Sequence, residues 1–74
     1  MDLEYSKAVG AVIRAARLAR GMTQEQLAAK AQLAGCDLTR SALAKIECGQ
    51  RSVYPDEVKA LHEALQIPYE ALLQ

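Results

Sequence analysis

Arg40, Ser41 and Lys45 are the residues whose types and spacing most clearly predict binding chemistry. All three side chains donate hydrogen bonds, and they lie in one short segment of helical character. That segment ends at Gly49 and follows another short helical segment that begins at Thr23; the two meet at a turn. Such a pair of helices, the second with an exposed polar face, is the minimum needed to place side chains in a DNA major groove.

The chain offers little for catalysis or for metal binding. It has no glycine-rich phosphate loop and no nucleophile beside a base, and we expect its single histidine, His62, at the surface or at the edge of the core. Cys36 and Cys48 with one histidine are too few ligands for a structural zinc site. Two half-buried free thiols are favoured over a disulfide. We therefore expect no enzymatic activity, no metal or other cofactor, and no small-molecule ligand.

Charge is distributed unevenly along the chain although the net charge is zero. Residues 14–51 hold seven basic and three acidic side chains, whereas residues 52–74 hold one lysine and four acidic side chains. A basic middle between acidic ends suits a protein that turns one face to a polyanion. A solvated mixed-charge surface would give the same counts, so this alternative stays open.

The apolar residues predict five helices in one small domain, residues 1–74. Fourteen alanines and only three aromatic residues suit closely packed helices rather than strands. Thr23 and Gln26 form a capping box, Thr39 can cap the next helix, and Pro55 can open another. The predicted helices cover residues 3–20, 24–33, 39–48, 55 through at least 65, and 69–73. No segment reaches the roughly eighteen apolar residues that span a bilayer, and the start lacks a signal-peptide pattern, so we expect a cytoplasmic protein without membrane contact.

An ordered set of residues resembles the lambda-repressor-like helix-turn-helix family of bacterial and phage regulators, also called Cro/repressor-type or XRE-like. The set consists of Ile13-Arg14 with Arg17, Gly21-Met22-Thr23-Gln24, Leu27-Ala28, and Ser41 with Ile46-Glu47 and Gly49. The resemblance extends from about residue 9 to residue 73. It implies an all-α, compact five-helix DNA-binding domain with an extended turn between helices two and three. It also implies a sequence-specific transcriptional regulator that binds double-stranded DNA as a homodimer, with helix three (39–48) reading a roughly palindromic operator.

The resemblance assigns roles to particular residues. The base-reading candidates lie at the start of helix three and one turn later, on one side: Arg40, Ser41, Ala44 and Lys45. A phosphate contact is nearly as well supported for Arg40. The residues with an implied phosphate contact are Gln24, Thr39, Gln50, Arg51 and Ser52. Gln24 can also serve only the helix start, and both roles can hold together. Arg17 and Glu47 are implied to form a structural ion pair, which suits the bidentate geometry of arginine.

Two features depart from the family pattern. Thr23 and Ile46 lie about five positions further apart than usual; the extra residues most simply lengthen helix two by about 1.4 turns and return through Gly35 and Asp37. The segment 32–38 either projects toward DNA or a protein partner, or is a tolerated loop, and the loop is slightly favoured. Cys48 stands where the family often has asparagine or a charged residue.

A second function stays open beside DNA binding. A protein-interaction module or antitoxin-like partner would keep the fold while binding another polypeptide. The neutral net charge and the acidic, leucine-containing C-terminal end support this alternative. The same C-terminal helix, with the loop before it, is the expected surface for a dimer.

Overall fold

The computed structural model describes residues 3–73, which form five α-helices joined by short connections. The bounds are α1 Leu3–Ala19, α2 Gln24–Leu33, α3 Arg40–Glu47, α4 Pro55–Leu65 and α5 Tyr69–Leu72. The predicted all-α, five-helix architecture is confirmed, and the predicted helix ends differ from these bounds by no more than one residue. None of the five helices is long and apolar enough to cross a bilayer.

Local side-chain chemistry fixes where three of these helices begin. At α2, the Thr23 hydroxyl accepts a hydrogen bond from the Gln26 amide at 3.1 Å, and the Gln26 side chain accepts one from the Thr23 amide at 2.8 Å. At α3, the Thr39 hydroxyl accepts from the Ala42 amide at 3.1 Å. Pro55 occupies the first position of α4, where its missing N–H has no consequence. These caps satisfy amides that the helices themselves cannot pair.

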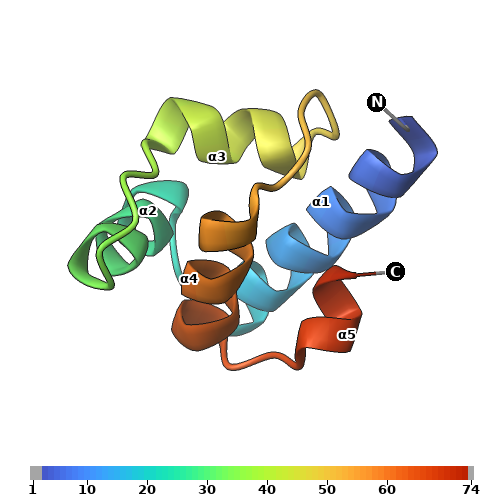
Figure 1. Cartoon of the computed structure of the whole chain (residues 1–74). Coiled ribbons are helices and arrows are strands. Elements are labelled where there is room, and N and C mark those ends of the chain that lie inside the picture. The colour runs from blue at the N-terminus through green and yellow to red at the C-terminus, as the bar shows by residue number, and fades with distance from the viewer. Residues whose placement is uncertain (1–2, 74) are drawn as a thin grey trace.

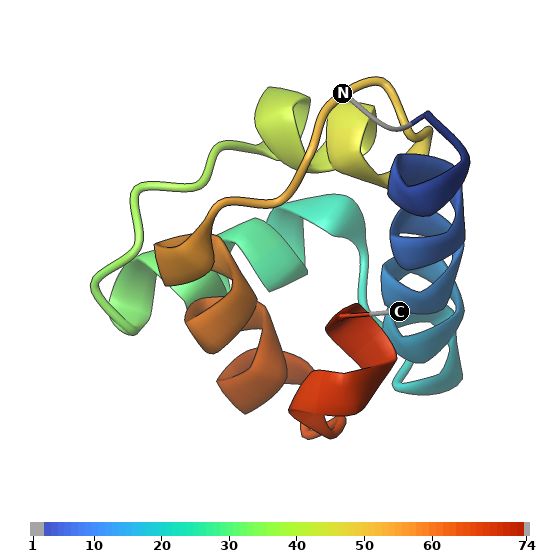
Figure 2. The ribbon, with the colours of Figure 1, turned by 45° about the vertical axis from the view of Figure 1, so that its right-hand side comes forward.

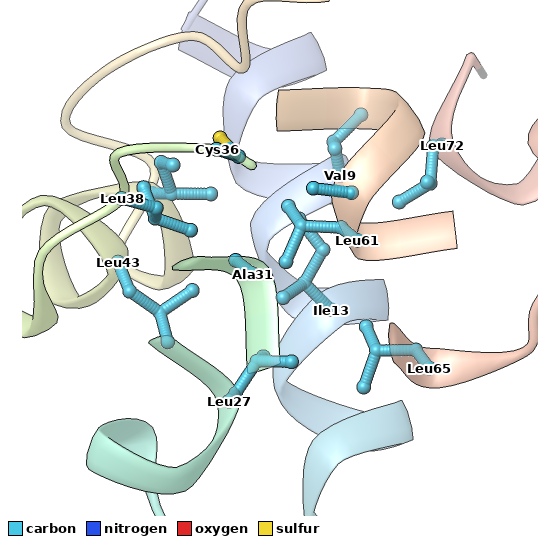
Figure 3. Packing of buried hydrophobic residues seen from close by; sticks show 12 residues of the cluster. Val9, Ile13, Leu27, Ala31, Cys36, Leu38, Leu43, Leu61, Leu65 and Leu72 are labelled. Atoms are coloured by element: carbon cyan, nitrogen blue, oxygen red, sulfur yellow. The ribbon is translucent and has the colours of Figure 1, made fainter. Parts of the chain in front are cut away.

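The helices surround one apolar core. α4 packs against both α1 and α2, α3 packs against α1 and α2 at one end of the molecule, and α5 packs against α1 and α4 (Figures 1 and 2). Nine large side chains are almost completely buried: Val9, Ile13, Leu27, Leu38, Leu43, Ile46, Leu61, Leu65 and Leu72. Figure 3 shows such side chains converging from separate helices and from the turn before α3. This core fixes the position of α3 relative to α1 and α2.

The approach of α1 to α3 depends on a glycine. A Cβ atom at Gly10 would lie 2.2 Å from the Ile46 carbonyl oxygen and 2.9 Å from that of Glu47. Because no side chain fits between the two backbones, Gly10 lets α1 lie directly against the end of α3. Glu47 is thereby held close to the C-terminal half of α1.

The connection between α2 and α3 is part of the core. Gly35 has φ of 89°, which turns the chain back after α2, and the side-chain amide of Gln32 donates to the Leu38 carbonyl at 2.9 Å. Cys36 and Leu38 are buried, whereas Leu33 remains 89% exposed. The turn is therefore anchored at its C-terminal half, and Leu33, the last residue of α2, is exposed beside its start.

Candidate nucleic-acid interface

The exposed side of α3 carries the residues that the sequence analysis predicts to read bases. Arg40, Ser41 and Lys45 are exposed and Ala44 is half-buried. Their spacing of one, four and five positions places them together on a helix surface. On the opposite side, the three buried residues Leu43, Ile46 and Glu47 face the rest of the protein. The polar side of α3 is therefore held outward by a buried side.

A bidentate ion pair fixes the end of α3 to α1. Arg17 Nε donates to Glu47 Oε2 at 2.7 Å, and Arg17 Nη2 donates to Glu47 Oε1 at 2.9 Å. Both residues are buried, and Arg17 Nη1 also donates to the Met22 carbonyl at 2.8 Å. The hydrogen bond with Glu47 raises the pKa of Arg17 and outweighs the opposing effect of burial, so the guanidinium stays charged. The pair joins α1, the loop before α2, and α3.

Gln24 completes this joint. Its side-chain amide donates to Glu47 Oε1 at 3.2 Å, which links the first residue of α2 to the end of α3. The side chain is half-buried, so part of it remains at the surface. The sequence analysis missed the contact with Glu47, because the two residues are 23 positions apart and no local pattern pairs them.

A second bidentate pair holds the segment after α3. Arg51 Nη1 and Nη2 donate to the two carboxylate oxygens of Glu57 at 2.8 and 2.5 Å, and Nη1 also donates to the Ser52 carbonyl at 2.7 Å. The Arg51 guanidinium lies 4.6 Å from the centre of the Tyr54 ring. The sequence analysis missed this pair: the position of Glu57, third in a helix opened by Pro55, explains its contact with the Tyr54 amide but does not indicate Arg51 as its partner.

The charges of this second pair are mutually stabilised. Burial alone raises the pKa of Glu57, but hydrogen bonds from Arg51 and from the Tyr54 amide lower it by more, so its pKa lies below the ordinary value. The hydrogen bond to Glu57 raises the pKa of Arg51. Because Arg51 is largely occupied inside the protein, it is less available to phosphate than its sequence position indicates.

A family model described as helix-turn-helix matches residues 13–72. This range includes both bidentate ion pairs, the Gln24–Glu47 contact and all of α3. The chain belongs to the Cro/C1-type helix-turn-helix family. The resemblance to lambda-repressor-like regulators is confirmed, and this helix-turn-helix protein is a DNA-binding regulator by family. Neither the search of curated proteins nor that of solved structures found a match.

The remaining predicted phosphate ligands of the helix-turn-helix protein lie at two places. Thr39, at the start of α3, is exposed, and its hydroxyl already accepts from Ala42. Gln50 is exposed directly after α3, and Ser52 is half-buried beside Arg51. The structure thus separates the start of α3 from the loop that follows it, and each carries polar side chains.

The two cysteines and the histidine have different environments. The prediction of two half-buried thiols is wrong, because Cys36 is buried and Cys48 is exposed; both are free. Cys36 packs with Leu38 in the core, and burial, then nearby Asp56, raises the pKa of its thiol. His62 lies at the core edge as predicted, 2.6 Å from the Ile67 carbonyl and stacked on Tyr69. No group of three metal-ligating side chains occurs within residues 3–73.

Proposed function

We propose that this helix-turn-helix protein is a sequence-specific transcriptional regulator that acts by binding DNA in the cytoplasm and catalyses no reaction. α3 enters the major groove, and its four outward residues contact base edges: Arg40, Ser41, Ala44 and Lys45. The observation that carries the proposal is the exposed, doubly cationic side of a helix whose other side is fixed by the core and by the Arg17–Glu47 pair. Arginine and lysine donate to guanine N7 and O6, so guanines are expected in each half-site.

Phosphate contacts flank these base contacts. The start of α2, with Gln24, and the start of α3, with Thr39, present polar groups toward one strand, and Gln50 and Ser52 do so after α3. Arg51 contributes little net attraction because Glu57 neutralises it at contact distance. We assign Arg51 chiefly to holding the loop that presents Gln50.

The size of the protein supports binding as a homodimer. Its Cα atoms extend over 29 × 20 × 19 Å, and successive major grooves on one side of DNA are about 34 Å apart. One copy therefore reaches one groove, and two copies related by a two-fold axis fit a roughly palindromic operator. The C-terminal end offers the contact surface, since Tyr69 is 40% and Leu73 60% exposed.

Selection of bound sequences from a random DNA pool tests the proposal directly. The expected result is a two-fold-related pair of guanine-containing half-sites, with affinity that falls with salt at a log–log slope of about −0.9 for each phosphate contacted. Replacing Arg40 and Lys45 by alanine should abolish selection without unfolding the protein, whereas Lys59→Ala, an exposed change on α4, should not. Absence of DNA binding at low salt, or binding that does not respond to salt, contradicts the proposal.

A protein-binding role is the second candidate function, and the exposure of Leu33 favours it. This side chain, on the last residue of α2 and next to the turn before α3, is 89% exposed. Contact with another polypeptide would remove its apolar surface from water. Such a role would survive the Arg40 and Lys45 substitutions and would be lost on Leu33→Glu, so the two variants separate the candidates.

A further inference from the structure

We propose that Glu25 is a positioning residue for Arg40, and that it makes Arg40 a reader of guanine rather than a ligand of phosphate. This inference rests on the proposed DNA-binding function. Glu25 is the second residue of α2, and Arg40 is the first residue of α3. The two side chains therefore face each other across the two helix starts that approach DNA.

The geometry identifies which part of the guanidinium Glu25 engages. Glu25 Oε1 lies 4.0 Å from Arg40 Nε, the distance of an ion pair rather than of a hydrogen bond. Because the carboxylate lies near Nε, both terminal nitrogens of Arg40 remain available to donate hydrogen bonds to DNA. Those two nitrogens are the donors that bind guanine N7 and O6 together.

Within residues 3–73, Glu25 is the only acidic residue that forms an ion pair with Arg40. The concave surface that Arg40 shares with Glu25 also includes Arg17, whose charge is already compensated by Glu47. Of the described residues that line this surface, Glu25 is the only one with a carboxylate. Its side chain is 80% exposed and that of Arg40 60% exposed, so both are accessible to DNA.

The exposed carboxylate also has a consequence for DNA of any sequence. Phosphates that approach the start of α2 meet the negative charge of Glu25 beside Gln24, which weakens attraction that does not depend on sequence. A guanine edge, in contrast, accepts two hydrogen bonds from the restrained Arg40. Glu25 therefore raises specificity in two ways, by orienting the base reader and by opposing non-specific contact.

Lys45 provides an internal contrast. It lies on the same exposed side of α3, but no ion pair or hydrogen bond of its side chain is seen within residues 3–73. Its ammonium group is free to rotate and lacks a planar fork. We expect Lys45 to discriminate less sharply between bases than Arg40.

The test compares two substitutions that share the charge change but differ in hydrogen bonding. Glu25→Gln removes the charge and keeps an oxygen acceptor, whereas Glu25→Ala removes both. The base read by Arg40 is first located as the guanine preference that disappears in Arg40→Ala. Affinities are then measured for the selected operator, for the operator with that guanine replaced, and for unrelated DNA. Glu63→Ala, an exposed change on α4, controls for net charge.

A bidentate arginine–guanine contact discriminates by about fivefold to 150-fold. Glu25→Ala and Glu25→Gln should both reduce this discrimination, and by similar amounts, because each removes the charge of an ion pair that has no hydrogen bond; Glu63→Ala should leave the discrimination unchanged. Both Glu25 variants should bind unrelated DNA about two- to fivefold more tightly. In the Arg40→Ala background, Glu25→Ala should change no base preference.

Three results would overturn the inference. One is an unchanged guanine preference in Glu25→Ala. Another is a change of base preference caused by Glu25→Ala in the Arg40→Ala background, because Glu25 would then act on a group other than Arg40. If the wild-type protein binds no DNA, the proposed function fails, and this inference fails with it. If the wild type binds DNA and the Glu25 variants show the same affinities and base preferences as the wild type, this inference alone fails.

Discussion

At the scale of single residues, two buried carboxylates organise the polar part of the protein. Glu47 accepts hydrogen bonds from two nitrogens of Arg17 and from the side-chain amide of Gln24. Glu57 accepts from two nitrogens of Arg51 and from the Tyr54 amide. Burying a carboxylate is costly unless donors replace the water it loses. Both carboxylates have three such donors. Replacing one member of either ion pair should therefore lower the free energy of unfolding more than replacing both members by apolar residues.

Replacing one member of the Arg17–Glu47 pair tests this asymmetry. Glu47→Ala leaves the buried guanidinium without its anion and should lower the free energy of unfolding by about 3 kcal/mol or more. The double substitution Arg17→Met with Glu47→Leu should recover much of this loss, because no buried charge remains. Urea unfolding gives both values. Equal losses in the single and double variants would mean that the pair itself, and not an unpaired charge, carries the energy.

The Arg51–Glu57 pair predicts a pH dependence of stability. The pKa of Glu57 is lowered in the folded protein, so its contribution is fully present above the ordinary carboxyl pKa of 4.5 and is lost as pH falls through the lower, folded value. Between pH 6 and pH 3, wild type should lose more stability than Glu57→Gln, whose pair is already absent. Urea unfolding at a series of pH values provides the comparison; parallel profiles for the two proteins would contradict it.

The two thiols should differ in reactivity. Cys48 is exposed, whereas Cys36 is buried and its pKa is raised, so less of the reactive thiolate is present at any given pH. A thiol-labelling reagent should modify Cys48 readily and Cys36 only when the protein unfolds. Cys48→Ser should therefore remove the fast phase of labelling and leave the slow one. Fast labelling of Cys36 in the native protein would contradict its place in the core.

At the scale of elements, sequence predicts helix starts well and contacts between helices poorly. The Thr23–Gln26 box, the Thr39 cap and Pro55 act within a few residues, and each marks the start of its helix. The contacts of Gln24 with Glu47 and of Arg51 with Glu57 depend on how helices and loops pack, so no local pattern reveals them. The Arg17–Glu47 pair was inferred from family resemblance rather than from spacing.

The close approach of α1 and α3 makes Gly10 sensitive to substitution. Gly10→Ala places a methyl group against the backbone carbonyls of Ile46 and Glu47, so the helices must separate. We expect a loss of about 1–3 kcal/mol in unfolding free energy, and weaker DNA binding because α3 shifts. Gly21→Ala is the control for strain without a clash: its added methyl group meets open space, and its positive φ should cost about 1–2 kcal/mol without moving α3. An equal loss of DNA binding in the two variants would show that packing at Gly10 does not position α3.

At the scale of the whole molecule, net charge and the count of basic residues predict DNA binding less well than the individual motifs do. A net charge of zero argues against DNA binding when taken alone, yet the chain belongs to a DNA-binding family. Intramolecular ion pairs compensate the charges of Arg17 and Arg51, and Glu25 lies 4.0 Å from Arg40. The count of basic residues in the middle of the chain therefore overstates the attraction to phosphate.

The proposed homodimer can be tested at its expected surface. Leu73→Glu places a charge at the exposed C-terminal end and should weaken binding to a two-site operator by about tenfold or more while sparing a single half-site. Leu33→Glu makes the same chemical change on the turn and should have no such effect. Titrations of the two DNAs provide the measurement. If both variants bind the two-site operator like wild type, the dimer uses another surface.

The turn between α2 and α3 has a consequence for how this lineage can change. Because Cys36 and Leu38 are built into the core, a deletion that shortens the turn also opens a cavity beneath α3. Lengthening at the exposed Leu33 meets no such obstacle. Insertions in this connection should therefore be tolerated better than deletions during evolution.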